Sequence, residues 1–194
     1  MLSQIRPALV LLTLLTLITG LIYPLIITGI AQIALPQQAN GSIVFKDGAV
    51  GSALIGQNFA SSKYFHGRPS ATSATDPNDD TKTIDAPYNA ANSTGSNLGP
   101  TSQKLVDRIK ADIETLHASV PVPADALTTS ASGLDPDISP ENARVQIETV
   151  AKARNLAVEK VQTLVAQQIR LPVLGLFGEP RVNVLMLNIA LDAL

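Results

Sequence analysis

The feature that most constrains this chain is a long gap in its charge. No charged side chain occurs between Arg6 and Lys46, and residues 8–27 are almost entirely apolar. A helix needs about 20 such residues to cross the hydrocarbon core of a bilayer. No later segment meets that requirement. The sequence therefore predicts a short tail (residues 1–6), one transmembrane anchor helix (7–35) and a soluble domain (36–194).

A cleaved signal peptide is the alternative interpretation of this segment. Its apolar region would usually run for about 7–15 residues before a small-residue cleavage site. Here the run is longer, and the only acceptable site, Gly29-Ile30-Ala31, comes late, so a retained anchor is favoured. Arg6 and the α-amino group lie on one flank, and the other flank has no Lys or Arg before Lys46. The positive-inside rule then predicts a cytoplasmic N-terminus and an external domain.

The anchor also carries polar and helix-breaking residues, namely Thr13, Thr16, Thr19, Gly20 and Pro24. Small and hydroxyl side chains let membrane helices approach and hydrogen-bond to one another. Threonine can equally bond back to its own helix. The segment alone leaves both interpretations open.

Composition excludes several functions for the soluble part. The chain has 16 acidic and 14 basic residues, and only Arg6 precedes Lys46, so residues 36–194 carry 16 acids against 13 bases. This net charge of −3 argues against nucleic acid as a partner, because such proteins display basic patches. Aromatic residues are scarce and tryptophan is absent, which disfavours stacking on bases or sugars. The absence of cysteine excludes disulfides and thiolate metal sites.

The soluble part predicts an α+β domain with a small β-sheet and about three helices. Residues 42–55 form a hairpin around Asp47-Gly48, because glycine takes positive φ cheaply. Apolar spacing predicts a helix over residues 101–118. Ser139-Pro140-Glu141 starts a second helix that ends near Asn155. A third helix carries the residues Val158, Val161, Leu164, Val165 and Ile169, and residues 181–188 read as a strand.

Residues 66–100 are different from the rest of the domain. Ile84 and Leu98 are their only Val, Ile, Leu, Met or Phe residues. Such long aperiodic stretches are usually functional or disordered. Within it, residues 76–80 resemble the start of a calcium loop. Thr81 and Pro87 occupy the positions that need glycine and glutamate, so a solvated acidic loop is favoured.

Few residues suggest chemistry. His117 lies on a predicted helix and His66 lies in a turn rich in aromatic and cationic residues. Residues 94–102 lead into a helix start and could cradle an anion with backbone N–H groups. They lack the P-loop pattern, so a tight loop with glycine at positive φ and Thr101 as the helix cap is favoured. The weak candidates for a nucleotide or anion are Gly95, Ser96, Asn97, Gly99 and Thr101.

Five motifs, taken in order after the anchor, are similar to one family. They are residues 51–59 (GSALIGQNF), 64–71 (YFHGRPSA), 95–101 (GSNLGPT), 132–140 (SGLDPDISP) and 178–188 (GEPRVNVLMLN). This order resembles the C subunit of the Kdp-type potassium-transporting P-type ATPase, over essentially the whole chain. The resemblance implies an accessory, non-catalytic subunit of a bacterial inner-membrane complex that takes up potassium with high affinity.

The resemblance also implies partners. In the family, a channel-like subunit selects potassium and a separate P-type subunit hydrolyses ATP, while the C subunit supports assembly and activity. The C subunit is also described as a catalytic chaperone that raises the ATP affinity of the hydrolytic subunit. It has no cofactor of its own, and ATP would be bound through the complex. An external domain could influence cytoplasmic ATP only by coupling across the complex.

The resemblance suggests that loops 64–71, 95–101 and 132–140 dock onto the potassium-selective subunit. The candidate docking residues are Tyr64, His66, Arg68, Asp135 and Gln146. The chain departs from the family pattern at Asp137, where histidine is usual, and at Thr149, where arginine is usual. Both changes remove basic character near loop 132–140.

Two other functions remain as alternatives from the residues. One is a membrane-tethered domain that binds an envelope ligand, such as a glycan or peptide. The other is an anchored hydrolase that uses His66 with Asp76 or Asp79. For the hydrolase, the sequence shows no recognisable set of nucleophile, base and orienting group.

Overall fold

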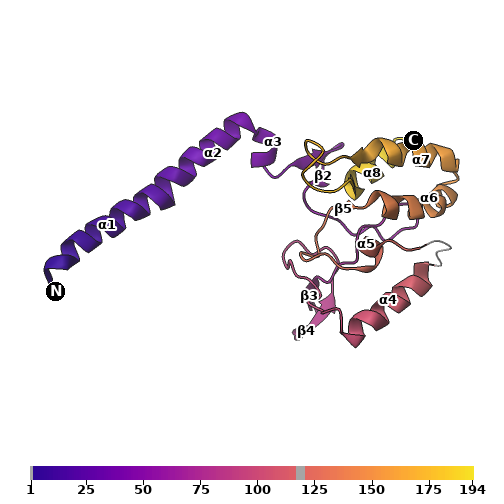
Figure 1. The fold of residues 1–194 in the computed structure, drawn as a ribbon, viewed down its shortest axis with the longest axis horizontal. Coiled ribbons are helices and arrows are strands. Elements are labelled where there is room, and N and C mark those ends of the chain that lie inside the picture. The colour runs from indigo at the N-terminus through magenta and orange to yellow at the C-terminus, as the bar shows by residue number, and fades with distance from the viewer. Residues whose placement is uncertain (1, 117–120) are drawn as a thin grey trace. The chain divides into compact units, whose positions relative to one another are not determined.

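The computed structural model describes residues 2–116 and 121–194 and divides into two units, residues 1–50 and 51–194. Figure 1 shows the order of the elements along the chain. The predicted α+β class is confirmed, with one apolar N-terminal helix followed by short strands and several helices. His117 lies outside the described residues.

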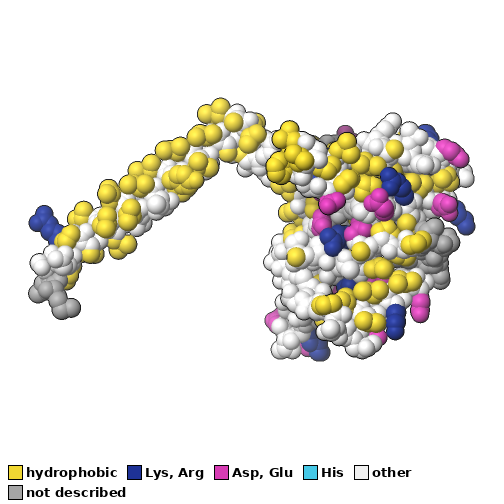
Figure 2. Space-filling model, in the orientation of Figure 1, with side chains coloured by type: hydrophobic (Ala, Val, Ile, Leu, Met, Phe, Trp, Pro, Cys, Tyr) yellow, Lys and Arg dark blue, Asp and Glu magenta, His cyan; other side chains and the backbone are white. Residues whose placement is uncertain are grey.

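The first unit is dominated by a continuous helix, Ile5–Ala34, preceded by the turn η1 (Leu2–Gln4). It is the one described helix that is long and apolar enough to cross a membrane, with a mean hydropathy of 2.4. At 1.5 Å per residue it is about 45 Å long, against a hydrocarbon core of about 30 Å. Figure 2 shows hydrophobic side chains along its length and a Lys or Arg side chain near its start. Where the membrane begins and ends along the helix stays a prediction.

The helix changes geometry in the middle. It consists of α1 (Ile5–Leu17), a π-helical segment η2 (Ile18–Ile22) and α2 (Tyr23–Ala34). Pro24 lacks an N–H group and its ring crowds the carbonyl group four residues earlier, at Gly20. The wider π turn precedes it, and the Tyr23 N–H donates to Ile18 O. Thr19 Oγ1 donates to Leu15 O at 2.7 Å, which confirms back-bonding at this one threonine.

After the short helix α3 (Pro36–Ala39), β1 (Ile43–Phe45) and β2 (Ala49–Ser52) form the predicted hairpin. Asp47 and Gly48 both have positive φ, as a tight Asp-Gly turn requires. The paired strands are shorter than residues 42–55, because Leu54 and Ile55 already lie in a turn.

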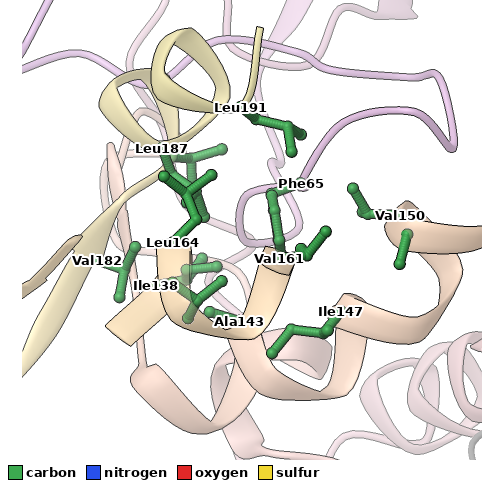
Figure 3. Close-up of a cluster of buried hydrophobic side chains, with 13 residues drawn as sticks. Phe65, Ile138, Ala143, Ile147, Val150, Val161, Leu164, Val182, Leu187 and Leu191 are labelled. Carbon is green, nitrogen blue, oxygen red and sulfur yellow. The ribbon is translucent and has the colours of Figure 1, made fainter. Parts of the chain in front are cut away.

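The core of the second unit surrounds a three-stranded antiparallel sheet. Its strand order is β5 (Asp137–Ile138), β7 (Arg181–Asn183), β6 (Ile169–Arg170). Helices α6 (Pro140–Arg154), α7 (Val158–Gln168) and α8 (Val184–Leu191) pack against β7 and successively against one another. Figure 3 shows their side chains converging, with Phe65 from a distant loop between them. All of the labelled side chains are buried.

Local sequence signals explain the ends of α6. Ser139 Oγ accepts a hydrogen bond from Asn142 N–H at 3.0 Å, Pro140 opens the helix, and Asn155 closes it with φ of 54°. These are the predicted start and end. Helix α4 (Gln103–Leu116) confirms a helix in the predicted place, starting two residues later than residue 101. The predicted end at residue 118 lies outside the described residues. However, Ile169 begins strand β6 and does not belong to the third helix.

The predicted strand over residues 181–188 is wrong beyond Asn183. The side chain of Asn183 accepts from Met186 N–H at 3.1 Å and starts α8. Helix α8 is apolar on nearly every side because it is buried among its neighbours. Such an all-round apolar pattern does not distinguish a helix from a strand.

The aperiodic stretch contains a hairpin that the sequence did not predict. Strands β3 (Ser73–Asp76) and β4 (Asp79–Asp85) pair antiparallel, with a register shift between Thr75 and Asp76. Asp76 Oδ1 accepts from Asn78 N–H at 2.8 Å, so the suspected calcium loop forms the hairpin turn. The small helix α5 (Ala124–Leu127) follows α4.

Leu187 of α8 is fully buried, whereas Leu194 is 44% exposed. We expect Leu187→Ala to lower the free energy of unfolding by about 2–5 kcal/mol, because it removes buried methyl groups and leaves a cavity. Leu194→Ala is the control and should change it by no more than about 0.5 kcal/mol. Urea unfolding of the full chain in mild detergent, followed by circular dichroism, measures both. Equal effects of the two substitutions would contradict the described core.

Candidate functional site

The loop that carries the first docking candidates is fixed by two amide side chains. Asn188 Nδ2 donates to Phe65 O at 2.9 Å, and Asn188 Oδ1 accepts from Phe65 N–H at 2.9 Å. Gln146 does the same for the next residue: its Oε1 accepts from His66 N–H at 2.7 Å and its Nε2 donates to His66 O at 3.2 Å. The backbone N–H and C=O groups of two consecutive residues are therefore paired as they would be by a neighbouring strand.

This arrangement places Phe65 in the core and leaves its neighbours near the surface. Tyr64 is half-buried and lies against Phe59, with ring centroids 5.6 Å apart. The guanidinium of Arg154 lies over the Tyr64 ring, 4.7 Å from its centroid, and bonds Asp192. His66 is exposed, and its Nε2 lies 3.2 Å from Ser61 O.

Arg68 connects this loop to the second Gly/Pro-rich loop. Its Nη1 lies 3.0 Å from Asp135 Oδ2, and both side chains are largely covered. Its remaining nitrogens donate to the carbonyl oxygens of Thr128 and Thr129 at 3.3–3.4 Å. A planar guanidinium can bond several acceptors at once, so Arg68 fixes the relative position of three segments.

Tyr88 packs against loop 64–71 and bonds to its backbone and to one of its side chains. Its hydroxyl donates to Arg68 O at 2.7 Å, its backbone N–H donates to Ser70 Oγ, and its φ is 62°. A Cβ atom on Gly67 would collide with the Tyr88 hydroxyl group, so only glycine fits there. Burial raises the pKa of Tyr88 to about 12, and nearby Asp135 adds to the shift. Tyr88 is the only aromatic residue between His66 and Pro100, which is the signal that sequence reasoning missed.

A cavity of about 460 Å³ opens between these segments and helix α6. Four of the five predicted docking residues line it: Tyr64, His66, Arg68 and Gln146. The fifth, Asp135, lines a neighbouring depression of about 570 Å³, where Arg68 also appears. The cavity wall includes apolar groups from Phe59, Pro69, Pro87, Tyr88, Val122 and Val145. Mixed apolar and polar linings of this size suit inserted side chains or a small ligand.

The two departures from the family pattern have defined surroundings. Thr149 is exposed at the cavity wall on α6. Asp137 accepts from Asn183 Nδ2 at 3.2 Å and pairs with Arg181 at 3.0 Å, which links β5 to β7. Burial raises the pKa of Asp137, and the contacts with Asn183 and Arg181 oppose that shift.

The candidate anion loop lies apart from both cavities. The expected glycine at positive φ is wrong, since Asn97 takes that conformation with φ of 52°. Gly95 is needed because a Cβ atom would press on the Ala131 backbone. Ser96 Oγ accepts from Thr129 Oγ1 at 3.1 Å, so this loop too is tied to the segment that Arg68 contacts. Thr101 does not cap α4, because the carbonyl of Ser102 accepts the first helical bonds.

The hydrolase alternative has no support in this geometry. Asp79 pairs with Lys82 at 2.8 Å, and Asp76 caps its own turn. The His66 ring lies against the Ser61 carbonyl oxygen, and the His66 backbone N–H donates to Gln146. Within residues 2–116 and 121–194, no group of three or more His, Cys, Asp or Glu residues could hold a metal ion.

Fold and site together describe a chain with one candidate membrane-spanning helix among its described residues, and a second unit that presents loops linked by side-chain contacts. The K+-transporting ATPase c-chain family, KdpC, matches residues 5–193, and the chain belongs to this family. A KdpC subunit of a potassium-transporting ATPase from Bradyrhizobium diazoefficiens is 65% identical over 99% of this chain and 98% of its own length. Those from Rhodopseudomonas palustris BisB18 and Methylobacterium nodulans are 60% and 61% identical, over 100% of this chain and 99% and 98% of their own lengths.

These similarities establish what kind of subunit the chain is. The chain is an accessory, non-catalytic subunit of a potassium-transporting ATPase, and another subunit hydrolyses ATP. The family therefore favours a complex component over a free-standing tethered binding domain.

The Tyr88 hydroxyl predicts a specific alkaline effect on stability. Below pH 10, Tyr88→Phe should cost about 0.5–1.5 kcal/mol through loss of the bond to Arg68 O. The Tyr88 hydroxyl has a pKa near 10.0 in the unfolded chain and of about 12 in the folded chain. Wild-type stability should therefore fall as pH rises through this window, and the gap to Tyr88→Phe should narrow. Urea unfolding from pH 8 to 11.5 measures the gap, and a gap that stays constant would contradict the buried hydroxyl.

Proposed function

We propose that the second unit is a docking module that binds the potassium-selective subunit through the cavity between loop 64–71 and α6. The observation that carries the proposal is that four of the five predicted docking residues, three from loop 64–71 and Gln146 from α6, line one cavity. Loops held on a rigid scaffold are the usual place for recognition. Loops 64–71, 95–101 and 132–140 are linked by Arg68 and by the contact of Thr129 with Ser96, so they present one preorganised surface. Preorganisation lowers the entropic cost of binding.

We also propose that the domain lies outside the inner membrane and the N-terminus inside. Support comes from the charge asymmetry around the anchor, with Arg6 on one flank and no Lys or Arg before Lys46 on the other. In this topology the partner surface is the external face of the potassium-selective subunit. The transmembrane helix then adds a second contact within the bilayer, with the P-type subunit joined through the complex.

The effect on ATP affinity that the family resemblance implies would be exerted at a distance. An external domain stabilises one state of the complex by its differential affinity for two states. The hydrolytic subunit would then bind ATP more tightly in the stabilised state, and the chaperone role needs no nucleotide contact by this chain. The packing of Gly95 and Ser96 against residues 129–131 supports a structural role for the candidate anion loop.

Thr149 offers the sharpest test of the docking surface. Thr149→Trp places a large side chain at the cavity wall from an exposed position. We expect it to weaken association with the potassium-selective subunit by about 2 kcal/mol, roughly 30-fold in Kd. Glu148→Trp is the matched control, because Glu148 is the exposed neighbour on α6 and does not line the cavity. Affinity purification in mild detergent measures the partner retained, and equal retention by both variants would remove the cavity from the interface.

The candidate anion loop gives a separate test of action at a distance. Asn97→Ala and Thr101→Ala change two exposed side chains of that loop. In the purified complex we expect the Kd for ATP to stay within about twofold of wild type, because neither side chain would touch nucleotide. Titration of the complex with a fluorescent ATP analogue measures this. A loss of affinity with an intact subunit composition would instead place nucleotide at this loop.

A further inference from the structure

The connection between β6 and β7 exposes an unusual concentration of apolar side chains. Five large residues within seven positions face solvent: Leu171 is 74% exposed, Val173 59%, Leu174 83%, Leu176 81% and Phe177 66%. Residues 171–177 contain no charged or hydrogen-bonding side chain. We call this segment the apolar loop. Contiguous exposed apolar surface marks a site of contact with protein or membrane.

The backbone of the apolar loop bonds to itself. Val173 and Phe177 form an antiparallel bridge in which each N–H donates to the other's carbonyl oxygen at 3.0 Å. The Gly175 N–H donates to Pro172 O at 3.0 Å, and the Leu176 N–H donates to Val173 O at 3.2 Å. Pro172 has no N–H group. Four N–H groups of the loop are therefore paired within it, which lowers the cost of moving this backbone out of water.

Charged residues lie at the base of the loop, not at its tip. Arg170 and Arg181 are register partners on β6 and β7, and Arg170 is exposed. Arg181 pairs with Asp137 at 3.0 Å. Glu179 is also exposed at the base, so the base carries charges of both signs while the tip carries none. This distribution suits an apolar tip in the interfacial region with charged groups left in water.

The predicted anchor keeps a bilayer within reach of the second unit. The candidate spanning helix ends at Ala34 and the second unit begins at Gly51. The residues between them, 35–50, can extend roughly 55 Å at most, so the second unit stays close to the membrane surface. Protein interfaces instead concentrate Tyr, Trp and Arg with hydrogen-bonding groups, which residues 171–177 lack.

We propose that the apolar loop inserts into the interfacial region of the bilayer that holds the chain's own helix. This second attachment would restrict the rotation of the tethered unit and orient its docking surface. The proposal does not depend on which side of the membrane the unit occupies, nor on the identity of its protein partner.

The absence of cysteine from the chain allows a direct test. Leu174→Cys in the full chain, and separately Leu176→Cys, is labelled with an environment-sensitive fluorophore and reconstituted into nanodiscs of phosphatidylglycerol and phosphatidylethanolamine. Ile84→Cys is the control, because Ile84 is an exposed apolar residue on β4, far from the loop in sequence. Quenching by nitroxide-bearing lipids and by aqueous iodide is compared, with and without the other subunits.

We expect a blue-shifted emission at positions 174 and 176, strong quenching by lipid nitroxides and weak quenching by iodide, in both preparations. The label at position 84 should show the reverse. Iodide quenching at positions 174 and 176 equal to that at position 84 would overturn the proposal. Protection from iodide only in the complex, without lipid quenching, would also overturn it and assign the loop to a protein partner.

Discussion

The candidate docking surface depends on the pairing of the Asn188 side chain with the backbone of Phe65. This amide takes the place of a neighbouring strand for the N–H and C=O groups of Phe65. In this buried environment an unpaired N–H or C=O group would cost about 1–3 kcal/mol. Because Phe65 is fixed in the core, its sequence neighbours Tyr64 and His66 stay nearer the surface. Gln146 then extends the same pairing to His66.

The other loops are also held by polar side chains, each of which bonds to a neighbouring loop. Arg68 binds Asp135 and the carbonyl oxygens of Thr128 and Thr129, and Thr129 in turn contacts Ser96. Each loop lacks an apolar core of its own, so its polar contacts with its neighbours determine its conformation. The result is a surface of loops that hold one another in place.

Local signals made much of the fold predictable from sequence. Ser139, Pro140 and Asn155 delimit α6 because caps and turn residues act within a few positions. The hairpin at Asp47-Gly48 follows for the same reason. Helix α8 was read as a strand, since a fully buried helix has no polar face to reveal its period. The β3–β4 hairpin was missed, because its strands are mostly exposed and carry no alternating apolar pattern.

The site was only partly predictable. Sequence motifs identified the loops, but the pairing of His66 with Gln146 joins residues 80 positions apart and leaves no local trace. Tyr88, Asn188 and Arg154 were overlooked, because a lone tyrosine, asparagine or arginine in a sequence does not show which backbone groups it will reach. The departures at Asp137 and Thr149 gained meaning only when one proved to link two strands and the other to line the cavity.

We propose that the loops linked by their own side chains form the surface that binds the potassium-selective subunit from outside the membrane. The most direct test is a photo-cross-linking amino acid at position 149 in the assembled complex, in which Thr149 would lie at the interface. The account predicts one dominant product, with the potassium-selective subunit, that is absent when the probe is moved to position 148. Cross-linking that is equal at both positions, or a product only with the ATP-hydrolysing subunit, would contradict it.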